Sequence, residues 1–399
     1  MMFATLRYRI AKNIILKLAR RIGVGELHLT FPEGDSHHFK GSKDGPTAQL
    51  SIIEPVGLNR IIKDGKMGFC EAYMANQVAS NNLVDLVEFA VLNNAYIEEK
   101  LQMNKLSWAL TKLRHNRNRN SKKGSKRNIS YHYDLGNDFY AEWLDETMTY
   151  SSAVFDKHTD NLSKAQEEKY RRLAEMADLK AGDKVLEIGC GWGGFVEFAA
   201  REYDVHVTGI TISQEQFDFA NQRIKNAGIT DKASIIMTDY RDLESASFDK
   251  VVSIEMFEAV GMAYWPAYFD KVADVLKKGG KAALQVITID DKEFDSYVAT
   301  PDFIQKYIFP GGMLPSMERI KAPIENAGMA LVEAKGYGLD YAKTLEIWRE
   351  KFLGKWPTIQ QNQGFDNQFK NMWELYLAYC EGGFKTGMID VKQMLLTRD

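Results

Sequence analysis

The chain has 399 residues, of which 45% are apolar and 26% are charged, so it can bury a large core and is longer than one typical domain. Nine prolines and the lack of a repeated period argue against a solenoid or a disordered scaffold, and three widely spaced cysteines argue against a disulfide framework. The net charge of −3 hides an asymmetry, because residues 1–130 hold 21 Lys and Arg against 11 Asp and Glu. We therefore expect the first part to meet an anionic surface, either membrane or nucleic acid.

The first predicted element is an amphipathic helix over Leu6–Ile22, with six basic residues, no acid, and Ile and Leu at helical spacing. Such a helix is typical of a segment that lies on anionic lipid. The alternative is a solvated helix that docks on its own domain. No apolar run approaches the length of a membrane span, and the first 25 residues lack the core of a signal peptide, so we expect a cytoplasmic protein.

A small mixed domain over residues 1–111 is predicted next, with strands at Leu27–Phe31 and Ala48–Ile53 and a helical pattern from Gly57 to Leu110. Residues 112–127 hold eight basic residues and no acid, which predicts a flexible linker. The linker lacks interleaved aromatics, so lipid phosphates are at least as plausible a partner as nucleic acid, and a merely solvated linker is the third reading.

Strands and helices alternate after the linker, so residues 128–399 are predicted to form one catalytic domain. The β-branched runs and helical patterns predict right-handed crossovers and a doubly wound parallel α/β sheet. The predicted strands are Lys184–Ile188, Val205–Ile210, Ala233–Met237, Phe248–Ile254 and Lys281–Thr288, and the predicted helices end at Arg201, span Ser213–Asn226 and span Tyr264–Leu276. Ligands of such sheets bind at the carboxyl ends of the strands.

The glycine turn EIGCGWGG, from Glu187 to Gly194, follows the first of these strands. Glycines there permit a sharp turn and a close approach of a nucleotide. An NAD site would need an acid about 20 residues later, yet that strand ends at Gly209-Ile210-Thr211. Glu187 instead precedes the first glycine, where a carboxylate can face the cationic amino-acid end of S-adenosylmethionine. The turn therefore predicts a methyltransferase, with a purely structural corner as the alternative.

From about Asn128 the sequence resembles the cyclopropane-fatty-acyl-phospholipid synthase family, which includes the mycolic acid methyltransferases. The likeness rests on YHYDLGNDFYAEWLDETMTYSSA, VLEIGCGWGG, VTGITISQEQ, DYRD, EMFEAVG and YIFPGG, in that order. It implies a Rossmann-like class I methyltransferase fold. The residues that it implies around S-adenosylmethionine are Tyr150, Ser151, Glu187, Gly189, Cys190, Gly191, Trp192, Gly193, Thr211, Ser213, Gln216 and Tyr240.

The resemblance also implies the chemistry, in which the π electrons of a cis double bond in an acyl chain take the methyl group. The resulting carbocation needs an apolar, aromatic and closed site. Candidate aromatics, each of which could equally be a core residue, are Tyr131, His132, Tyr133, Phe139, Tyr140, Trp143, Tyr150, Tyr307, Phe309 and Tyr341. Pro301–Ser316, which contains the YIFPGG motif, suits a lid over the acyl chain or a buried loop.

The family uses bound bicarbonate as the base, which by resemblance would contact Glu258, Tyr341 and the backbone of Ile287. Two expected ligands differ, because the usual cysteine is Ser152 and the usual histidine is Gln285. Gln cannot add the charge of a histidine, so bicarbonate binding is doubtful, and Glu258 or a water beside it is the predicted proton acceptor. These departures lead to the hypothesis of a methylene- or methyl-branched product instead of a cyclopropane ring.

Cys380 matches a cysteine discussed as an active-site residue in the family. The alkene is itself the nucleophile, so we expect Cys380 to pack instead of react. We expect no metal, a homo-oligomer, no nucleic-acid partner, and peripheral association with the inner face of the membrane. Two rival functions stay open: a methyltransferase of RNA or of a small molecule, and a non-catalytic lipid-binding relative.

Overall fold

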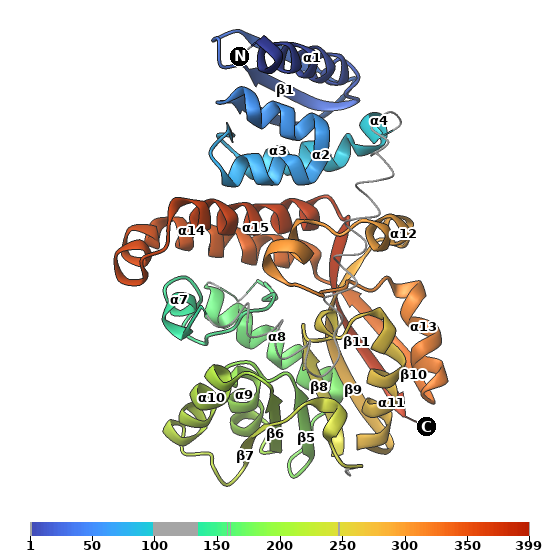
Figure 1. Cartoon of the computed structure of the whole chain (residues 1–399). Coiled ribbons are helices and arrows are strands. Elements are labelled where there is room, and N and C mark those ends of the chain that lie inside the picture. The colour runs from blue at the N-terminus through green and yellow to red at the C-terminus, as the bar shows by residue number, and fades with distance from the viewer. Residues whose placement is uncertain (1, 99–134, 158, 160, 246–247, 399) are drawn as a thin grey trace.

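The computed structural model describes residues 2–98, 135–157, 159, 161–245 and 248–398. Two separate β-sheets organise this part of the chain, with a pair of long helices between them (Figure 1). The predicted linker, residues 112–127, lies outside the described residues, as do Tyr131, His132 and Tyr133.

The N-terminal layer contains a four-stranded sheet in the order β2-β1-β3-β4. Its strands are β1 (Val24–Thr30), β2 (Ser36–Lys40), β3 (Lys43–Ile52) and β4 (Val78–Ala79), and its helices are α1 (Met2–Ala19), α2 (Pro55–Met74), α3 (Leu83–Leu92) and α4 (Asn94–Glu98). The sequence predicted β1, β3 and α1 but missed β2, whose residues include two histidines and a lysine instead of an apolar alternation. The predicted continuous helical stretch was wrong, because β4 interrupts it.

The second sheet has seven strands in the order β10-β11-β9-β8-β5-β6-β7, and β11 runs antiparallel to both of its neighbours. The strands are β5 (Lys184–Ile188), β6 (His206–Thr211), β7 (Ala233–Met237), β8 (Phe248–Ile254), β9 (Leu276–Ile289), β10 (Met329–Gly336) and β11 (Ile389–Arg398). The predicted doubly wound α/β sheet is confirmed, while β10 and β11 add an edge that the sequence did not predict.

Helices cover both faces of this sheet because its strands are apolar on both sides. Val185 of β5 packs in one core with α8 (Leu162–Ala177), α9 (Gly194–Glu202) and α10 (Gln214–Asn226). The next residue, Leu186, points to the other core, which contains residues of α11 (Trp265–Val275) and α13 (Met317–Asn326). The alternation of side chains along each strand therefore fixes which residues face which layer of helices.

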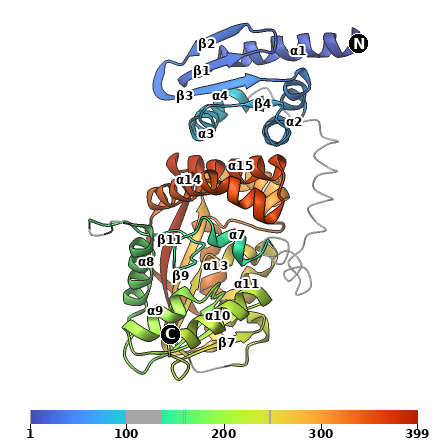
Figure 2. The same cartoon turned by 90° about the vertical axis from the view of Figure 1, so that its left-hand side faces the viewer.

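Two long helices, α14 (Gly338–Gln363) and α15 (Asn367–Lys385), lie between the large sheet and the N-terminal layer (Figures 1 and 2). Asn371 of α15 donates hydrogen bonds to the carbonyls of Tyr73 and Met74, at the end of α2, and to Asn76 at 2.8 Å. One apolar core includes residues of α3, α14 and α15. The N-terminal layer is thus packed against the helices above the carboxyl edge of the sheet.

The described residues also form several shorter helical elements. They are α7 (Asn137–Ala141), α12 (Asp291–Ala299), a π-helical turn over Ile304–Ile308, and the single 3₁₀ turns η2 (Tyr240–Asp242), η3 (Phe257–Ala259) and η4 (Met262–Tyr264). Both η2 and η3 begin shortly after a parallel strand ends, so they lie at the edge where the sheet is expected to bind its ligands.

Candidate active site

A large cavity opens at the carboxyl ends of the parallel strands and continues to helices α2 and α3 of the N-terminal layer. Its volume is about 2120 Å³, whereas small-molecule pockets usually enclose roughly 300–1,000 Å³. The predicted site residues that line it are Tyr150, Ser151, Glu187, Gly189, Cys190, Gly191, Trp192, Thr211, Gln216, Tyr240, Glu258, Tyr341 and Cys380. The cavity has room for a nucleotide-sized cofactor together with a long second ligand.

The glycine turn after β5 has the conformation that its sequence predicts. Gly189, Gly191 and Gly193 have φ angles of 80°, 51° and 80°, in the left-handed region that favours glycine. A Cβ atom at Gly189 would lie 2.6 Å from the side chain of Met256, so this position also lacks space for a side chain. Gly193 does not line the cavity and serves instead as the N-cap of α9.

Glu187 is almost fully buried, with 2% of its surface exposed. One of its carboxylate oxygens has no hydrogen-bond partner among the described residues. Burial raises the pKa of Glu187 to about 8, and the nearby Lys169 opposes that rise. A buried carboxylate with an unpaired oxygen is suited to a cationic ligand, so the residue fits the amino-acid end of S-adenosylmethionine.

Lys169 of α8, which the sequence analysis missed, does not line the cavity but contacts Ser151, which does. Its side chain is fully buried, and Nζ donates a hydrogen bond of 2.7 Å to the hydroxyl of Ser151. Gln166, one helical turn earlier, donates to the carbonyl of Ser151 at 3.0 Å. Burial lowers the pKa of Lys169 to about 7, against the opposite influence of nearby carboxylates that include Glu255 and Glu187. Gln166 and Lys169 are three residues apart and therefore lie on one helix face, which is the sequence feature that could have indicated their shared contact.

The loop after β6 places neutral groups where an NAD enzyme has an acid. The Thr211 hydroxyl donates to Gln216 Oε1 at 2.9 Å, and both residues line the cavity. Ser213 does not line it, because its hydroxyl accepts from the backbone N–H of Gln216 and caps α10. Ser213 therefore positions the loop instead of facing the cavity.

The candidate aromatics divide into two groups. Phe139, Tyr140 and Trp143 are fully buried in a core of edge-to-face and tilted rings and do not line the cavity. The members that do line it are Tyr150, Tyr307, Phe309 and Tyr341, joined by Tyr240 and Tyr376. The hydroxyls of Tyr150 and Tyr376 are hydrogen-bonded at 2.7 Å. Six of the aromatic side chains named here thus contribute to the wall of the cavity.

Glu258 lies in η3 beyond β8 and lines the cavity. The backbone N–H of Ile287 donates to one of its carboxylate oxygens, whereas the resemblance implied that this N–H contacts bicarbonate. The other oxygen is buried and has no partner among the described residues. Burial and the adjacent Glu255 raise the pKa of Glu258 to about 8, so this carboxyl is mostly protonated at neutral pH.

Glu255 is a second carboxylate of the site, beside Glu258, and the sequence analysis missed it. Tyr341 donates to its Oε2 at 2.7 Å, whereas Gln285 Nε2 and the backbone N–H of Ser152 both donate to its Oε1 at 2.8 Å. The residue follows directly after β8, and its φ of 51° is rare for a non-glycine residue. Ligands of such sheets bind at the carboxyl ends of the strands, and this rule also selects the position of Glu255 after β8.

The bicarbonate pocket implied by the family is therefore filled in this chain. Ser152, Gln285 and Tyr341 are three of the expected ligand positions, and each already donates to Glu255. Ser152 and Gln285 do not line the cavity, whereas Glu255 does. The residues do not fit a bound bicarbonate, because a carboxylate of the protein already occupies their donors.

Cys380 lines the cavity from α15. Burial raises the pKa of its thiol far above the ordinary value, so it is a neutral, packed side chain in this environment. Cys190 in the turn is buried, and its pKa is raised in the same way. Neither thiol has the electropositive surroundings of a reactive cysteine.

The far end of the cavity lies in the N-terminal layer and is apolar. Its lining residues there include Ile15, Leu18, Leu27, Leu50, Ile61, Ile62, Leu86, Val87 and Phe89. The segment Pro301–Ser316 contributes Phe303, Ile304 and Phe309 to the wall. It is tied to α2 by Lys306, which forms an ion pair of 2.6 Å with Glu71.

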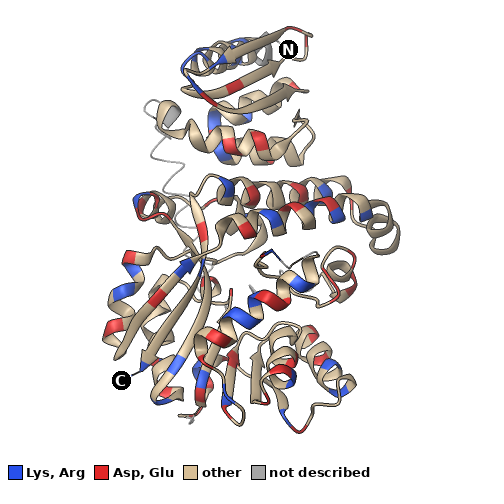
Figure 3. Cartoon of the chain, turned by 180° about the vertical axis from the view of Figure 1, so that it is seen from behind, with Lys and Arg blue, Asp and Glu red and all other residues tan. Residues whose placement is uncertain are grey.

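Helix α1 combines features of both predicted alternatives. Its inner face is docked, because Ala11 and Ala19 are buried and Lys12 pairs with Glu33 and Asp35. Its outer face exposes Leu6 and Ile10 together with basic residues. Elsewhere Lys and Arg are interspersed with Asp and Glu over the helices of Figure 3. In the part of the chain that the structure describes, no helix is long and apolar enough to span a membrane.

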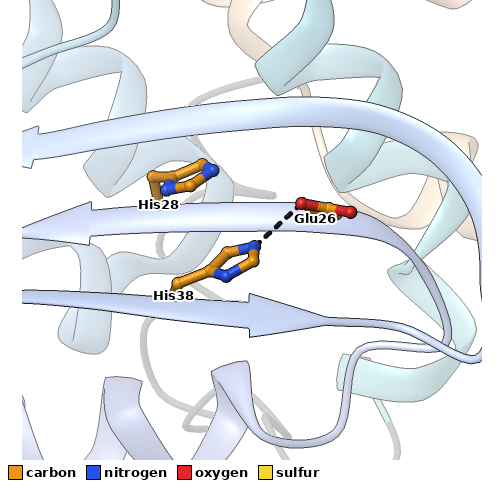
Figure 4. A group of neighbouring side chains, drawn as sticks. All are labelled: Glu26, His28 and His38. Carbon is orange, nitrogen blue, oxygen red and sulfur yellow. Dashed lines mark hydrogen bonds and ion pairs between the residues drawn. The ribbon is translucent and has the colours of Figure 1, made fainter.

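One group of side chains within the described ranges has the spacing of metal ligands, although the sequence analysis expected none. Glu26 and His28 of β1 and His38 of β2 have ligand atoms within 4.8 Å of one another (Figure 4). The carboxylate of Glu26 is already shared between His38 and Lys40, both at 2.8 Å. A cation would have to displace the Lys40 ammonium, so these contacts are those of a surface ion-pair cluster.

Comparison with known proteins identifies the family that the sequence motifs resemble. The family model for mycolic acid cyclopropane synthetase matches residues 120–394. The chain is 37% identical to the tuberculostearic acid methyltransferase UfaA1 of Mycobacterium tuberculosis, over 98% of this chain and 91% of that protein. It is also 37% identical to the cyclopropane-fatty-acyl-phospholipid synthase of Escherichia coli, over 88% of each. The solved structure of the mycolic acid cyclopropane synthase CmaA1 with SAH and CTAB aligns with a TM-score of 0.62 and 28% identity, over 68% of this chain and 98% of that one.

Proposed function

The chain belongs to the mycolic acid cyclopropane synthetase family of S-adenosylmethionine-dependent methyltransferases, and we propose that its substrate is an unsaturated fatty-acyl chain of a membrane phospholipid. The methyl group goes to the cis double bond of that chain. The observation that carries the proposal is the continuity of one cavity from the glycine turn to the apolar interior of the N-terminal layer. A nucleic acid or a small polar substrate would not need that apolar extension.

The apolar end of the cavity suits an acyl chain that leaves a bilayer. Each methylene exposed to water during that transfer would cost about 0.8 kcal/mol, so a route lined by Leu, Ile, Val and Phe keeps the cost low. Lys63, Lys66 and Lys292 also line the cavity, and the Lys63 side chain is 80% exposed. Ammonium groups at the solvent side would meet the phosphate of the headgroup.

When it is bound, S-adenosylmethionine supplies an electrophilic methyl group. Glu187 and the Thr211–Gln216 loop hold its polar ends, and the glycine turn allows its backbone approach. The π electrons of the substrate double bond then form the new carbon–carbon bond and leave a cation on the acyl chain. Ring faces of Tyr150, Tyr341 and Tyr376 stabilise that charge in a site closed to water.

The product depends on whether a hydride shift moves the cation before the added carbon loses a proton. Loss from the added carbon with ring closure gives a cyclopropane, whereas loss after a hydride shift gives a methylene branch. A saturated methyl branch would need a separate reductant. The substitutions at Ser152 and Gln285 support the branched product, and proton NMR of the extracted lipid distinguishes the two because only the ring gives a cyclopropane signal.

The test is transfer of labelled methyl from S-adenosylmethionine by the purified protein. We expect label in vesicles of dioleoyl phospholipid and none in matched vesicles of saturated phospholipid. Label in RNA or in a small molecule instead would contradict the proposal, as would binding of S-adenosylhomocysteine without transfer to any lipid. The last result would support a non-catalytic lipid-binding relative.

Peripheral association with the inner face of the membrane forms part of the proposal. The outer face of α1 supports it, with exposed Leu6 and Ile10 among basic residues. Of the 21 Lys and Arg within residues 1–130, ten fall within residues 99–130, against a single acid there. Co-sedimentation with anionic vesicles should therefore fall as salt rises. Association into a homo-oligomer is likewise proposed and is tested by light scattering.

A further inference from the structure

We propose that Glu255 is the built-in base of this enzyme and that its carboxylate takes the place of the bicarbonate used by the family. The inference rests on the proposed function, because it names the group that accepts the proton lost by the methylated acyl chain. It replaces the interpretation from sequence, which assigned that role to Glu258 or to a water beside it.

The geometry of the donors carries the inference. Three donors, from Ser152, Gln285 and Tyr341, converge on one carboxylate at 2.7–2.8 Å. A carboxylate and bicarbonate share a planar O–C–O group, so bicarbonate would present the same two acceptor oxygens to these donors. Glu255 supplies it covalently, from the position immediately after β8, and lines the cavity in front of Ser152 and Gln285.

The surroundings hold the donors in this arrangement. Gln393 of β11 is the cross-strand partner of Gln285, and its side-chain amide donates to Gln285 Oε1 at 3.0 Å. Gln285 is therefore oriented with its NH₂ toward Glu255 and toward the carbonyl of Ser152. The hydroxyl of Ser152 donates to the carbonyl of Ala153, so it is not aimed at an anion in the cavity.

The two carboxyl groups differ in their capacity to accept a proton. Burial raises the pKa of Glu255, but the hydrogen bonds that both of its oxygens accept from Tyr341, Gln285 and Ser152 oppose that rise, as does the buried Lys169. Glu258 accepts only backbone hydrogen bonds, among them that from Ile287, and one of its oxygens has no partner among the described residues. One proton shared by such a pair resides on the group with fewer donors, so Glu255 stays ionised and available.

The step balances without another reactant. A C–H bond of the added carbon breaks, and its electron pair forms either the third side of the ring or the double bond of the methylene branch. The proton goes to the carboxylate of Glu255, which becomes a neutral carboxylic acid. The positive charge on the chain is thereby cancelled, and the proton returns to solvent after the product leaves.

The experiment compares the full-length wild type with Glu255→Gln and Glu255→Gly, and uses exposed Glu350→Gln as the matched control. Glycine suits the left-handed backbone at this position, so Glu255→Gly should fold. We expect wild-type and Glu350→Gln turnover to change less than twofold when dissolved bicarbonate is removed. Glu255→Gln should lose about 10²–10⁴-fold in kcat, as expected for removal of a general base, with unchanged affinity for S-adenosylhomocysteine.

A binding measurement separates failure of this inference from failure of the proposed function. ¹³C NMR with labelled bicarbonate needs no acyl substrate, and we expect specific binding to Glu255→Gly alone, with rescue of its turnover by added bicarbonate. Bicarbonate binding to the wild type, dependence of wild-type turnover on bicarbonate, or full activity of Glu255→Gln would each overturn the inference. Lack of bicarbonate binding to Glu255→Gly would also overturn it. If the wild type transfers no methyl group to lipid under any condition, the proposed function fails instead.

Discussion

Replacing Glu187 with Gln removes the buried carboxylate that faces the cofactor turn while it keeps the size of the side chain. A hydrogen bond to a charged group contributes about 1.5–3 kcal/mol, which corresponds to a change of about 10- to 140-fold in Kd. We therefore expect Glu187→Gln to weaken the binding of S-adenosylhomocysteine by that factor. This ligand carries the same amino-acid end as the cofactor but has no reactive methyl group.

The pH dependence gives a second signature of the same residue. In the free protein burial raises the pKa of Glu187 to about 8, whereas the complex needs the ionised form to meet an ammonium group. Binding therefore releases a proton below pH 8, and affinity rises with pH. Between pH 6 and pH 7 the Kd of the wild type should fall up to about tenfold, because one proton is exchanged per ligand bound. Glu187→Gln should lose that slope.

Isothermal titration calorimetry at pH 6 and pH 7, in buffers of different ionisation enthalpy, measures both the Kd and the proton release. Glu350→Gln, an exposed substitution of the same type, should match the wild type in both. Equal Kd values for wild type and Glu187→Gln, or parallel pH slopes for the two proteins, would refute the assignment of Glu187 to the ammonium group.

Two further predictions concern the base and the turn. Tyr341→Phe removes a hydrogen-bond donor to the ionised form of Glu255, so the pKa of that carboxyl should rise. The acid limb of the pH profile of kcat/KM should then move to higher pH by about one unit. An unmoved limb would contradict the role of Glu255. Gly189→Ala combines a left-handed backbone with a clash against Met256 and should lower the free energy of unfolding by about 2–4 kcal/mol. Its control, Gly364→Ala, has the same backbone strain but open space around the new Cβ and should lower it by about 1 kcal/mol. Urea unfolding of both variants checks the difference, and equal losses would show that the contact with Met256 is unimportant.

The sequence predicted the strands whose side chains alternate between two apolar layers, and it predicted β5, β7 and β8 with their observed bounds. It missed β10 and β11, since an antiparallel edge at the end of the chain depends on pairing with the distant β9. It also ended the linker and the small domain within residues that the structure does not describe, so those boundaries stay predictions.

The site was predicted where single residues have local signatures, as with Glu187 before the glycines. Lys169 and Glu255 were missed for a physical reason. Lys169 sits among charged residues of α8 that resemble a solvated face, yet tertiary packing buries it completely. Glu255 is the first residue of the EMFEAVG motif, and only the folded chain shows that its carboxylate accepts hydrogen bonds from three other segments. The doubt about bicarbonate, raised from Ser152 and Gln285, pointed to residues that surround Glu255, although the sequence assigned the proton to Glu258 or to a water beside it.

The most direct test of the account uses S-adenosylmethionine whose transferred methyl group carries three deuterium atoms. The purified protein and vesicles of dioleoyl phospholipid are incubated, and the acyl chains are analysed by mass spectrometry. Removal of a proton from the added carbon by Glu255 predicts acyl chains that gain one carbon and keep two deuterium atoms, in both the ring and the methylene product. Chains that keep all three deuterium atoms, or lipids without any label, would contradict the account.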